Sequence, residues 1–299
     1  MDVAVTGSTG LIGEALCASL TADGHTVRRV RRGSSASAGD VAWDLDERTI
    51  DAAALEGVDG VVHLAGEPIA ARRWTDAQRR RIHDSRTTGT ALLAEALAGL
   101  ERKPSVLVSA SAIGYYGERG DDVVTEDDPP ADGFLGRVCQ DWEAAALPAS
   151  EAGIRVAHPR TGIVLTPRGG ALAKMLPLFK IGLGGRFGSG RQWMSWISLT
   201  DEVRALRFLL DHDVAGPANL TAPEPVRNAE LASTLGEVLG RPSLVPVPEF
   251  GPKLLLGGEL ADELLFNSAR IVPRTLLDAG FEFSHPTLGD GLRAELGRS

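Results

Sequence analysis

Three glycines near the start of the chain have a spacing that suits phosphate binding. Residues 6–13 read Thr-Gly-Ser-Thr-Gly-Leu-Ile-Gly, which follows a short apolar run and precedes a helical pattern. In that setting the first glycine permits a tight turn, the second lets the backbone approach a pyrophosphate, and the third lets helix and strand pack closely. The N–H groups at the start of the helix then face the phosphates. The pattern predicts a dinucleotide site rather than a turn that merely starts a helix. Its candidate residues are Gly7, Ser8, Thr9, Gly10, Leu11, Ile12 and Gly13.

Basic residues after the second apolar run indicate which dinucleotide is preferred. An NAD site places Asp or Glu about 20 residues after the glycines, to hold the ribose hydroxyls. Between Asp23 and Asp40 this chain has no acidic residue and has arginines at positions 28, 29, 31 and 32. A guanidinium holds a 2′-phosphate through bidentate, charge-assisted hydrogen bonds. We therefore expect NADP(H) in preference to NAD(H), with Arg32 as the first candidate for the phosphate contact and Arg31 as the second. The alternative is a solvated basic strand edge that discourages aggregation.

Strand and helix patterns alternate through the first half of the chain. Strand patterns cover residues 2–6, 25–30, 60–64, 105–109 and 154–158, and helical patterns cover 11–22, 75–100 and 134–151. Strands separated by helices of this length pair in parallel through right-handed crossovers. The pattern predicts an α/β fold with a doubly wound parallel sheet. Ligands of such sheets lie outside the carboxyl ends of the strands, so the loops after Thr6, Leu64 and Ser109 are expected to line one crevice.

The pattern changes beyond residue 166. A glycine-rich stretch spans residues 182–190, capped helices are expected over 200–210 and 228–239, and four prolines follow. We expect an NADP(H)-binding Rossmann domain over residues 1–166 and a smaller C-terminal α+β substrate lobe over 167–299, with the two interleaved. Residues 174–196 combine glycines with Arg186, Arg191 and Trp193. That combination favours a substrate lid over a structural meander, and it would suit an anionic or sugar-like substrate.

Composition and charge exclude several classes of protein. The 299 residues are 43% hydrophobic and 24% charged, which is typical of a globular protein with a sizeable core. Because the formal net charge is −9, we expect a small-molecule substrate and neither nucleic-acid nor membrane partners. The two cysteines and six histidines lack ligand spacing, so no metal site is expected. No leader pattern or membrane-spanning run is present, and we expect a cytoplasmic protein. The oligomeric state is unknown from the sequence.

Several motifs together resemble the extended short-chain dehydrogenase/reductase superfamily. They are the glycine fingerprint, Val-His-Leu-Ala-Gly at 62–66, Ser-Ala-Ser-Ala at 109–112, Trp-Ile-Ser-Leu-Thr-Asp-Glu at 196–202 and Gly-Pro-Ala-Asn-Leu at 216–220. A second set is Leu-Ala-Gly-Glu-Pro-Ile at 64–69, Arg-Trp at 73–74, Asp-Ser-Arg at 84–86, Gly-Tyr-Tyr-Gly at 114–117, Arg-Thr-Gly at 160–162 and Gly-Ser-Gly-Arg-Gln at 188–192. This set resembles the atypical NAD(P)-dependent epimerase subfamily often labelled nucleoside-diphosphate-sugar epimerase, whose C-terminal segment is a domain of unknown function. The resemblance implies a Rossmann fold and hydride-transfer chemistry.

The usual catalytic residues of that superfamily are missing. Its members use a Tyr with a Lys four residues later, together with a Ser and an Asn. In this chain no Tyr-x-x-x-Lys occurs. Placing the family's helix on residues 134–143 puts Leu135 and Cys139 at the Tyr and Lys positions. Arg86 stands where the family has Asn, and Ser111 retains the Ser.

Two hypotheses follow from this loss. In the first, Ser111 with Tyr115 or Tyr116 forms a rebuilt catalytic site facing the nicotinamide, and Arg86 stabilises a developing oxyanion. That site would catalyse either epimerisation or a single carbonyl reduction. In the second, the chain binds NADP(H) without turnover and regulates another protein. In either case we expect crevice residues that follow other strands to add coenzyme contacts. These residues are Leu64, Ala65, Gly66, Glu67 and Arg160.

Overall fold

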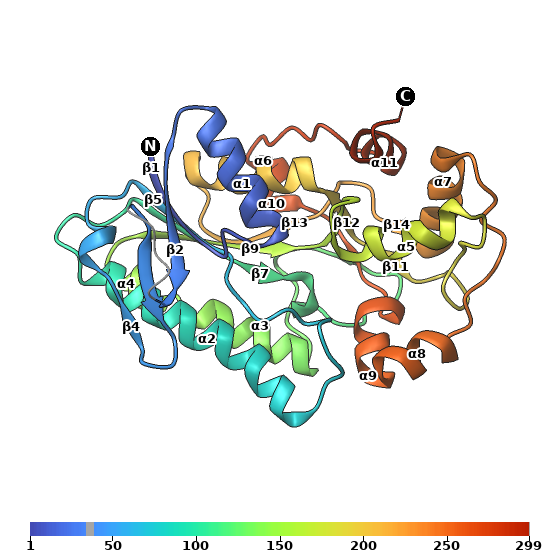
Figure 1. Cartoon of the computed structure of the whole chain (residues 1–299), viewed down its shortest axis with the longest axis horizontal. Helices are drawn as coiled ribbons and strands as arrows, with labels where there is room; N and C mark the ends of the chain where they lie inside the picture. The colour runs from blue at the N-terminus through green and yellow to red at the C-terminus, as the bar shows by residue number, and fades with distance from the viewer. Residues whose placement is uncertain (34–38, 299) are drawn as a thin grey trace.

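The centre of the protein is a twisted, mostly parallel β-sheet (Figure 1). The computed structural model describes residues 1–33 and 39–298. Within them the sheet has nine strands in the order β13-β9-β6-β5-β1-β2-β3-β4, with β7 paired to β9. Every pairing in it is parallel except that of β3 with β4. The strands are β1 (Asp2–Thr6), β2 (Thr26–Arg32), β3 (Val41–Asp44), β4 (Thr49–Ile50), β5 (Gly60–His63), β6 (Val106–Ser109), β7 (Ser111–Ala112), β9 (Arg155–Thr161) and β13 (Gly216–Leu220).

Helices cover both faces of this sheet, as Figure 1 shows. One face packs against α1 (Leu11–Ala22) and α6 (Leu199–Asp211). The other packs against α2 (Asp76–Ala98) and α4 (Leu147–Glu151). Successive side chains of a strand point to opposite faces, so β1 contributes Val3 and Val5 to the first core and Ala4 to the second. The predicted doubly wound α/β class is therefore confirmed.

Local capping signals place the long helices. Thr75 accepts a hydrogen bond from the N–H of Gln78 at the start of α2, as expected for an N-cap threonine. The single helix predicted over residues 134–151 is wrong, because the chain forms α3 (Phe134–Ala144), a turn, and then α4. The physical reason is Pro148, which lies in the first turn of α4 and has no N–H to continue a preceding helix.

The second half of the chain completes the sheet and also builds a separate lobe. Strand β13 pairs with β9, and α6 packs on the same core as α1, although both lie beyond residue 166. A distinct core joins α5 (Gly170–Lys180), α7 (Asn228–Leu239) and α11 (Leu288–Leu296) on the right of Figure 1.

The remaining elements are short. They are η2 (Ala53–Leu55), η3 (Ile113–Tyr115), β8 (Val123–Val124), β10 (Ile163–Leu165), β11 (Trp193–Met194), β12 (Trp196–Ser198), β14 (Val226–Arg227), α8 (Phe250–Leu256), α9 (Gly258–Ala261), η4 (Asp262–Phe266), β15 (Arg270–Ile271) and α10 (Arg274–Asp278).

No helix within residues 1–33 and 39–298 is both long enough and apolar enough to cross a membrane.

Candidate coenzyme and substrate site

The loops after β1 and β5 are held together by one threonine. Thr6 Oγ1 accepts hydrogen bonds from the N–H groups of Leu64 (3.0 Å) and Ala65 (3.1 Å) and lies 2.7 Å from His63 Nδ1. Complete burial lowers the pKa of His63 to about 4, so its ring is neutral and Nδ1 accepts the hydroxyl proton. These bonds fix the carboxyl ends of two neighbouring parallel strands, which is where the predicted crevice lies.

The glycine loop has the close contacts that its sequence predicts. Gly7 has φ +65°, and a β-carbon there would lie 2.8 Å from the carbonyl carbon of Leu64. A β-carbon on Gly13 would lie 2.2 Å from the carbonyl oxygen of Gly7. Gly10 is the N-cap residue of α1, and it has no side chain that could accept a hydrogen bond from the first N–H groups of the helix. The first N–H groups of α1 therefore remain available for an anion, and the loop fits a bound pyrophosphate.

The other residues of the fingerprint differ in exposure. Ser8 is buried, Thr9 is exposed, and Leu11 and Ile12 are half-buried. Leu11 packs beside Gly169 in the turn before α5, while Ile12 contributes to the wall of the main cavity. The amino end of α1 thus faces the space between the sheet and the C-terminal lobe.

The arginines of β2 divide into two groups. Thr6 pairs with Val30, so Arg31 and Arg32 extend beyond the last paired residue of β1, alongside the glycine loop. Arg31 lies 3.5 Å from a carboxylate oxygen of Asp40, and Arg32 is exposed. Arg28, in contrast, binds Asp2 at the opposite end of the strand pair. Strand register therefore separates Arg28 from the glycine loop, whereas Arg31 and Arg32 lie beside it.

The loop after β5 is fastened to α2. The N–H of Glu67 donates to Ser85 Oγ (3.0 Å), and Gln78 Nε2 donates to Glu67 Oε1 (3.1 Å). Arg86 Nη1 donates to the carbonyl oxygen of Glu67 (2.9 Å), and a β-carbon on Gly66 would lie 3.3 Å from the Arg86 guanidinium carbon. Helix α2 therefore sets both the position of this loop and that of Arg86.

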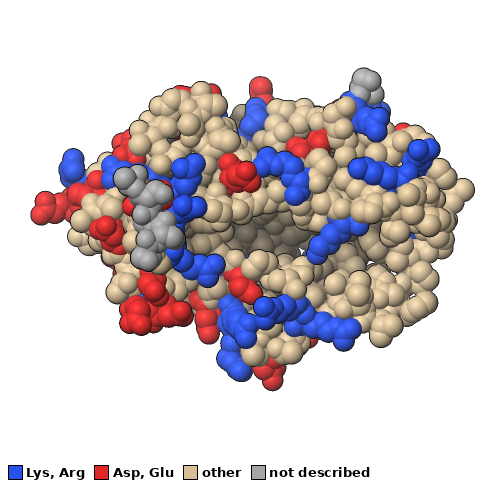
Figure 2. Space-filling view, in the orientation of Figure 1, with Lys and Arg blue, Asp and Glu red and all other residues tan. Residues whose placement is uncertain are grey.

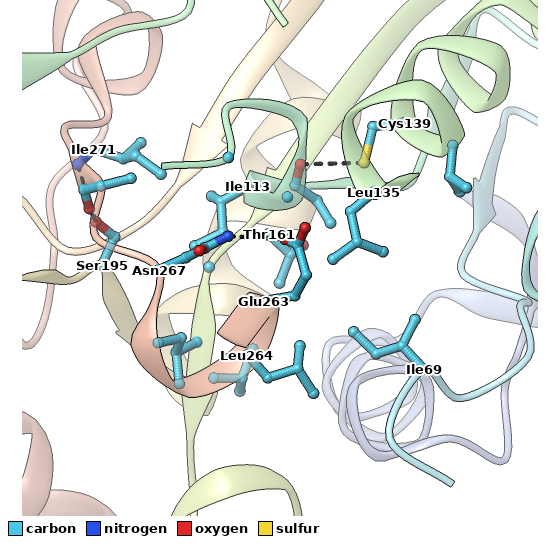
Figure 3. A pocket seen from close by; sticks show the side chains of 18 of the residues that line it. Ile69, Ile113, Leu135, Cys139, Thr161, Ser195, Glu263, Leu264, Asn267 and Ile271 are labelled. Carbon is cyan, nitrogen blue, oxygen red and sulfur yellow. Dashed lines mark hydrogen bonds between the residues drawn. The ribbon is translucent and has the colours of Figure 1, made fainter. Parts of the chain in front are cut away.

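A cavity of about 440 Å³ lies between the carboxyl ends of the strands and the C-terminal lobe. Figure 2 shows the molecule hollowed at its middle, with Lys and Arg side chains around the rim. Ile12 lies on its α1 side, Thr161 comes from the end of β9, and Glu263 from η4. In Figure 3, Glu263 points into the cavity, and Ile69 and Leu135 lie on the opposite side.

Arg86 brings a positive charge to this largely apolar cavity. Its guanidinium lies 4.9 Å above the ring of Trp142, and Nη1 also donates to the carbonyl oxygen of Ile82. Burial lowers the pKa of Arg86, although a guanidinium stays protonated in proteins. Nearby, burial raises the pKa of the Cys139 thiol to about 12, so Cys139 contributes no thiolate at neutral pH.

Two other predicted catalytic side chains lie in a buried network behind the cavity wall. Ser111 Oγ donates to Glu143 Oε1 (2.6 Å), and Arg160 binds both carboxylate oxygens of Glu143. Arg160 Nη1 donates to the Tyr116 hydroxyl (2.8 Å), which in turn donates to Asn219 Oδ1 (2.7 Å). Tyr116 is fully buried, and burial raises its pKa. The hydroxyls of Ser111 and Tyr116 are thus already engaged inside the protein.

Tyr115 belongs to the same cluster. The Arg160 guanidinium carbon lies 3.4 Å from the centre of the Tyr115 ring, and the two tyrosine rings meet edge to face. The neighbouring residues 112–114 and Gly117 line the cavity, whereas of the four predicted catalytic residues Arg86 is the one that does so. Glu143, which joins Ser111 to Arg160, was missed because nothing in the sequence marks a glutamate on α3 as their partner.

A second buried carboxyl group escaped the sequence analysis. Glu202, in the first turn of α6, is fully buried and accepts a hydrogen bond from Thr161 Oγ1 (2.8 Å). Burial raises the pKa of Glu202 to about 8. Because Thr161 also lines the cavity, this carboxyl group fixes the orientation of a hydroxyl at the site.

Comparison with known proteins identifies the family of this chain. The model of the NAD dependent epimerase/dehydratase family matches residues 3–221, and DUF1731, a domain of unknown function, matches residues 247–295. Epimerase family protein Mb2239 of Mycobacterium bovis is 47% identical over 291 residues, which cover 97% of this chain and 96% of that protein.

Solved structures agree with this placement. The crystal structure of human epimerase family protein SDR39U1 (isoform 2) with NADPH has a TM-score of 0.91 at 35% identity and covers 99% of each chain. A structure described as the nucleoside-diphosphate sugar epimerase from Corynebacterium glutamicum has a TM-score of 0.78 at 37% identity, covering 99% of this chain and 58% of that one. The resemblance seen in the sequence motifs is confirmed, and the chain belongs to the NAD-dependent epimerase/dehydratase family with DUF1731 as its C-terminal segment.

Proposed function

We propose that the protein is an NADP(H)-dependent oxidoreductase or epimerase of the atypical extended short-chain type. The observation that carries the proposal is the amino end of α1, which has no side-chain cap and whose Ile12 lines the same cavity as Arg86. A phosphate-binding helix end and a buried cation beside one cavity suit a coenzyme and a reacting oxygen. The solved human relative with NADPH supports the coenzyme assignment.

The glycine loop and the loop after β5 would hold the coenzyme. The backbone of residues 7–13 would take the pyrophosphate, and residues 64–67 would border its nicotinamide half. Arg32, with Arg31 beside it, would bind the 2′-phosphate, which favours NADP(H) over NAD(H). When bound, the nicotinamide supplies or accepts a hydride at a carbonyl or carbinol carbon.

For the predicted catalytic residues we propose two roles. Arg86 stabilises negative charge on the substrate oxygen, because its guanidinium is desolvated and lines the cavity. Ser111, Tyr115, Tyr116 and Arg160 form a positioning network that fixes the cavity wall at residues 112–114. The polar groups of Ser111, Tyr116 and Arg160 bind one another or Glu143, and the Tyr115 ring packs against the Arg160 guanidinium.

The experiment is coenzyme titration followed by turnover. Purified protein is titrated with NADPH and with NADH, and NADPH-saturated protein is then assayed with a panel of carbonyl compounds. We expect tighter binding of NADPH and consumption of NADPH with some of these compounds. We expect Arg86→Gln to lower turnover far more than it lowers the affinity for NADPH, because Arg86 also holds the carbonyl oxygen of Glu67 in the coenzyme loop. Absence of affinity for both coenzymes contradicts the proposal. Tight NADPH binding without turnover on any compound supports the regulatory alternative instead.

A further inference from the structure

The lining of the cavity points to the class of substrate. We infer that the protein acts on a compact, largely apolar carbonyl compound, or the corresponding alcohol, and not on a nucleoside diphosphate sugar. This inference rests on the proposed function and adds the substrate to it. In the reductive direction the carbonyl carbon gains a hydride, its oxygen gains a proton from water, and NADPH becomes NADP⁺.

The first argument is the apolar wall. Side chains from four separate parts of the chain converge on the cavity: Ile69 from the loop before α2, Ile82 from α2, Leu135 and Val138 from α3, and Leu264 from η4. Figure 3 shows Ile69, Leu135 and Leu264 around the same space. Contact with such a wall favours an apolar ligand, because binding removes apolar surface of both partners from water. A sugar ring would gain little from these contacts.

The second argument is that three polar side chains of the wall, those of Ser195, Asn267 and Thr161, are already engaged. Ser195 Oγ donates to the carbonyl oxygen of Ala269 (2.8 Å) and accepts from the N–H of Ile271 (3.0 Å). Asn267 Nδ2 donates to Glu263 Oε2 (2.9 Å).

Thr161 is engaged in the same way, because its hydroxyl proton goes to Glu202. The hydroxyls of a bound sugar would therefore lose hydrogen bonds to water without full replacement, which costs free energy for each one buried.

The third argument is charge. Arg86 is the one Lys or Arg among the described residues that line the cavity, and its position suits a single oxygen of the substrate. Glu263 lies in the same wall, and burial together with Glu259 and Asp262 raises its pKa. A diphosphate carries at least two negative charges and is normally held by several cations and N–H groups. A wall that offers one arginine, with Glu263 on the same cavity, lacks the cations that a diphosphate needs.

The adjoining polar hollow, of about 260 Å³, does not supply the missing cations. Its carboxylates are Glu118, Asp121 and Glu249, against two arginines. Arg227 is already bound to Asp121 (2.8 Å) and stacked on Trp193 (4.0 Å from the ring centre). A diphosphate extending from the main cavity would therefore meet a region with more carboxylates than guanidinium groups.

The fourth argument is space. Pockets for small molecules have volumes of about 300–1,000 Å³, and this cavity of about 440 Å³ must also admit the reacting ring of the coenzyme. What remains suits one compact molecule. The Corynebacterium glutamicum relative described as a nucleoside-diphosphate sugar epimerase shares the fold, but a shared fold does not fix the substrate.

The test compares two ligands by calorimetric titration of protein saturated with NADP⁺, which cannot reduce an aldehyde, so the heat reports binding alone. The probes are 2-naphthaldehyde, as an apolar carbonyl compound, and UDP-glucose. We expect 2-naphthaldehyde to bind at least tenfold more tightly than UDP-glucose. Equal or tighter binding of UDP-glucose overturns the inference, and so does the absence of binding by 2-naphthaldehyde when NADPH binds normally. Failure of NADPH itself to bind refutes the proposed function instead, so the two failures are distinguishable.

A pair of matched variants tests the apolar wall directly. Ile69→Asp places a charge in the cavity wall, whereas Leu147→Asp places the same charge at a site that is 54% exposed at the start of α4, away from the cavity. We expect Ile69→Asp to weaken 2-naphthaldehyde binding at least tenfold with NADPH affinity unchanged. We expect Leu147→Asp to leave both affinities unchanged. Equal effects of the two substitutions on 2-naphthaldehyde overturn the assignment of the cavity.

Discussion

Arg160 holds Glu143 through two parallel hydrogen bonds, from Nε to Oε1 at 2.8 Å and from Nη2 to Oε2 at 2.9 Å. The Arg160 side chain is 3% exposed and that of Glu143 is 14% exposed, so this is a buried ion pair. Burial by itself lowers the pKa of Arg160, but the bonds and charge of Glu143 reverse this and raise it. The pair joins β9 to α3 directly beneath the cavity wall, and it anchors Ser111 and Tyr116 as well.

Removing the charge of Glu143 is expected to destabilise the fold. Glu143→Gln leaves the buried Arg160 guanidinium without its counter-ion, which costs about 3–5 kcal/mol when one partner of a buried pair is lost. Urea denaturation monitored by circular dichroism measures the change. The matched control is Asp127→Asn, which removes the exposed partner of Arg274 and should change stability by less than about 1 kcal/mol. Similar losses for both variants would contradict a special role for the buried pair.

Substitution of Arg32 is expected to change coenzyme preference. Arg32→Ala removes a charge-assisted contact to the 2′-phosphate worth roughly 1.5–3 kcal/mol. NADPH affinity should therefore fall about 10- to 100-fold, with NADH affinity almost unchanged, as measured by coenzyme fluorescence titration. Arg28→Ala is the control, because Arg28 binds Asp2 at the other end of the strand and should not alter the NADPH to NADH ratio. An equal loss for both coenzymes in Arg32→Ala would reject the assignment.

The tight packing of Gly13 predicts a loss of coenzyme binding on addition of one methyl group. In Gly13→Ala the β-carbon would lie 2.2 Å from the Gly7 carbonyl oxygen, so the glycine loop must shift. Overpacking of this kind costs about 1–3 kcal/mol, and NADPH affinity should fall with thermal stability. Gly251→Ala is the control, since its β-carbon would meet no atom within 4 Å. Unchanged NADPH affinity in Gly13→Ala would show that the loop does not hold the coenzyme.

The raised pKa of Glu202 predicts that part of the free energy of unfolding is lost as pH rises. Its pKa is raised by burial to about 8 in the folded protein from an ordinary value of 4.5, so the folded state binds more protons than the unfolded state between these values. The Glu202 contribution is fully present below pH 4.5 and is lost as pH rises to about 8. Glu202→Gln keeps an acceptor for Thr161 but does not titrate. The difference in unfolding free energy between wild type and variant should therefore shift in favour of the variant from pH 5 to pH 8. A difference that is constant across this range would contradict the prediction.

The sequence alone determined the features that depend on residues close together in the chain. The glycine spacing at residues 7–13 fixed a turn, a close helix–strand contact and an uncapped helix end, all within one short segment. Thr75 marked the start of α2 for the same reason, since an N-cap hydrogen bond joins residues three apart. The alternation of strands and helices then left few possible topologies, which is why the doubly wound sheet could be predicted.

The tertiary structure decided which polar side chains face the cavity. Ser111 and Glu143 are 32 residues apart and Tyr116 and Asn219 are 103 apart, so no local pattern reveals that these groups bind each other. The sequence predicts Arg86 and Ser111 equally as catalytic residues. In the structure Arg86 lines the cavity, whereas the Ser111 hydroxyl donates to the Glu143 carboxylate. The burial of Glu202 likewise follows from the packing of α6 on the sheet. Such pairings depend on the packing of elements distant in the chain, because a side chain's partners are fixed only once the surrounding helices and strands are in place.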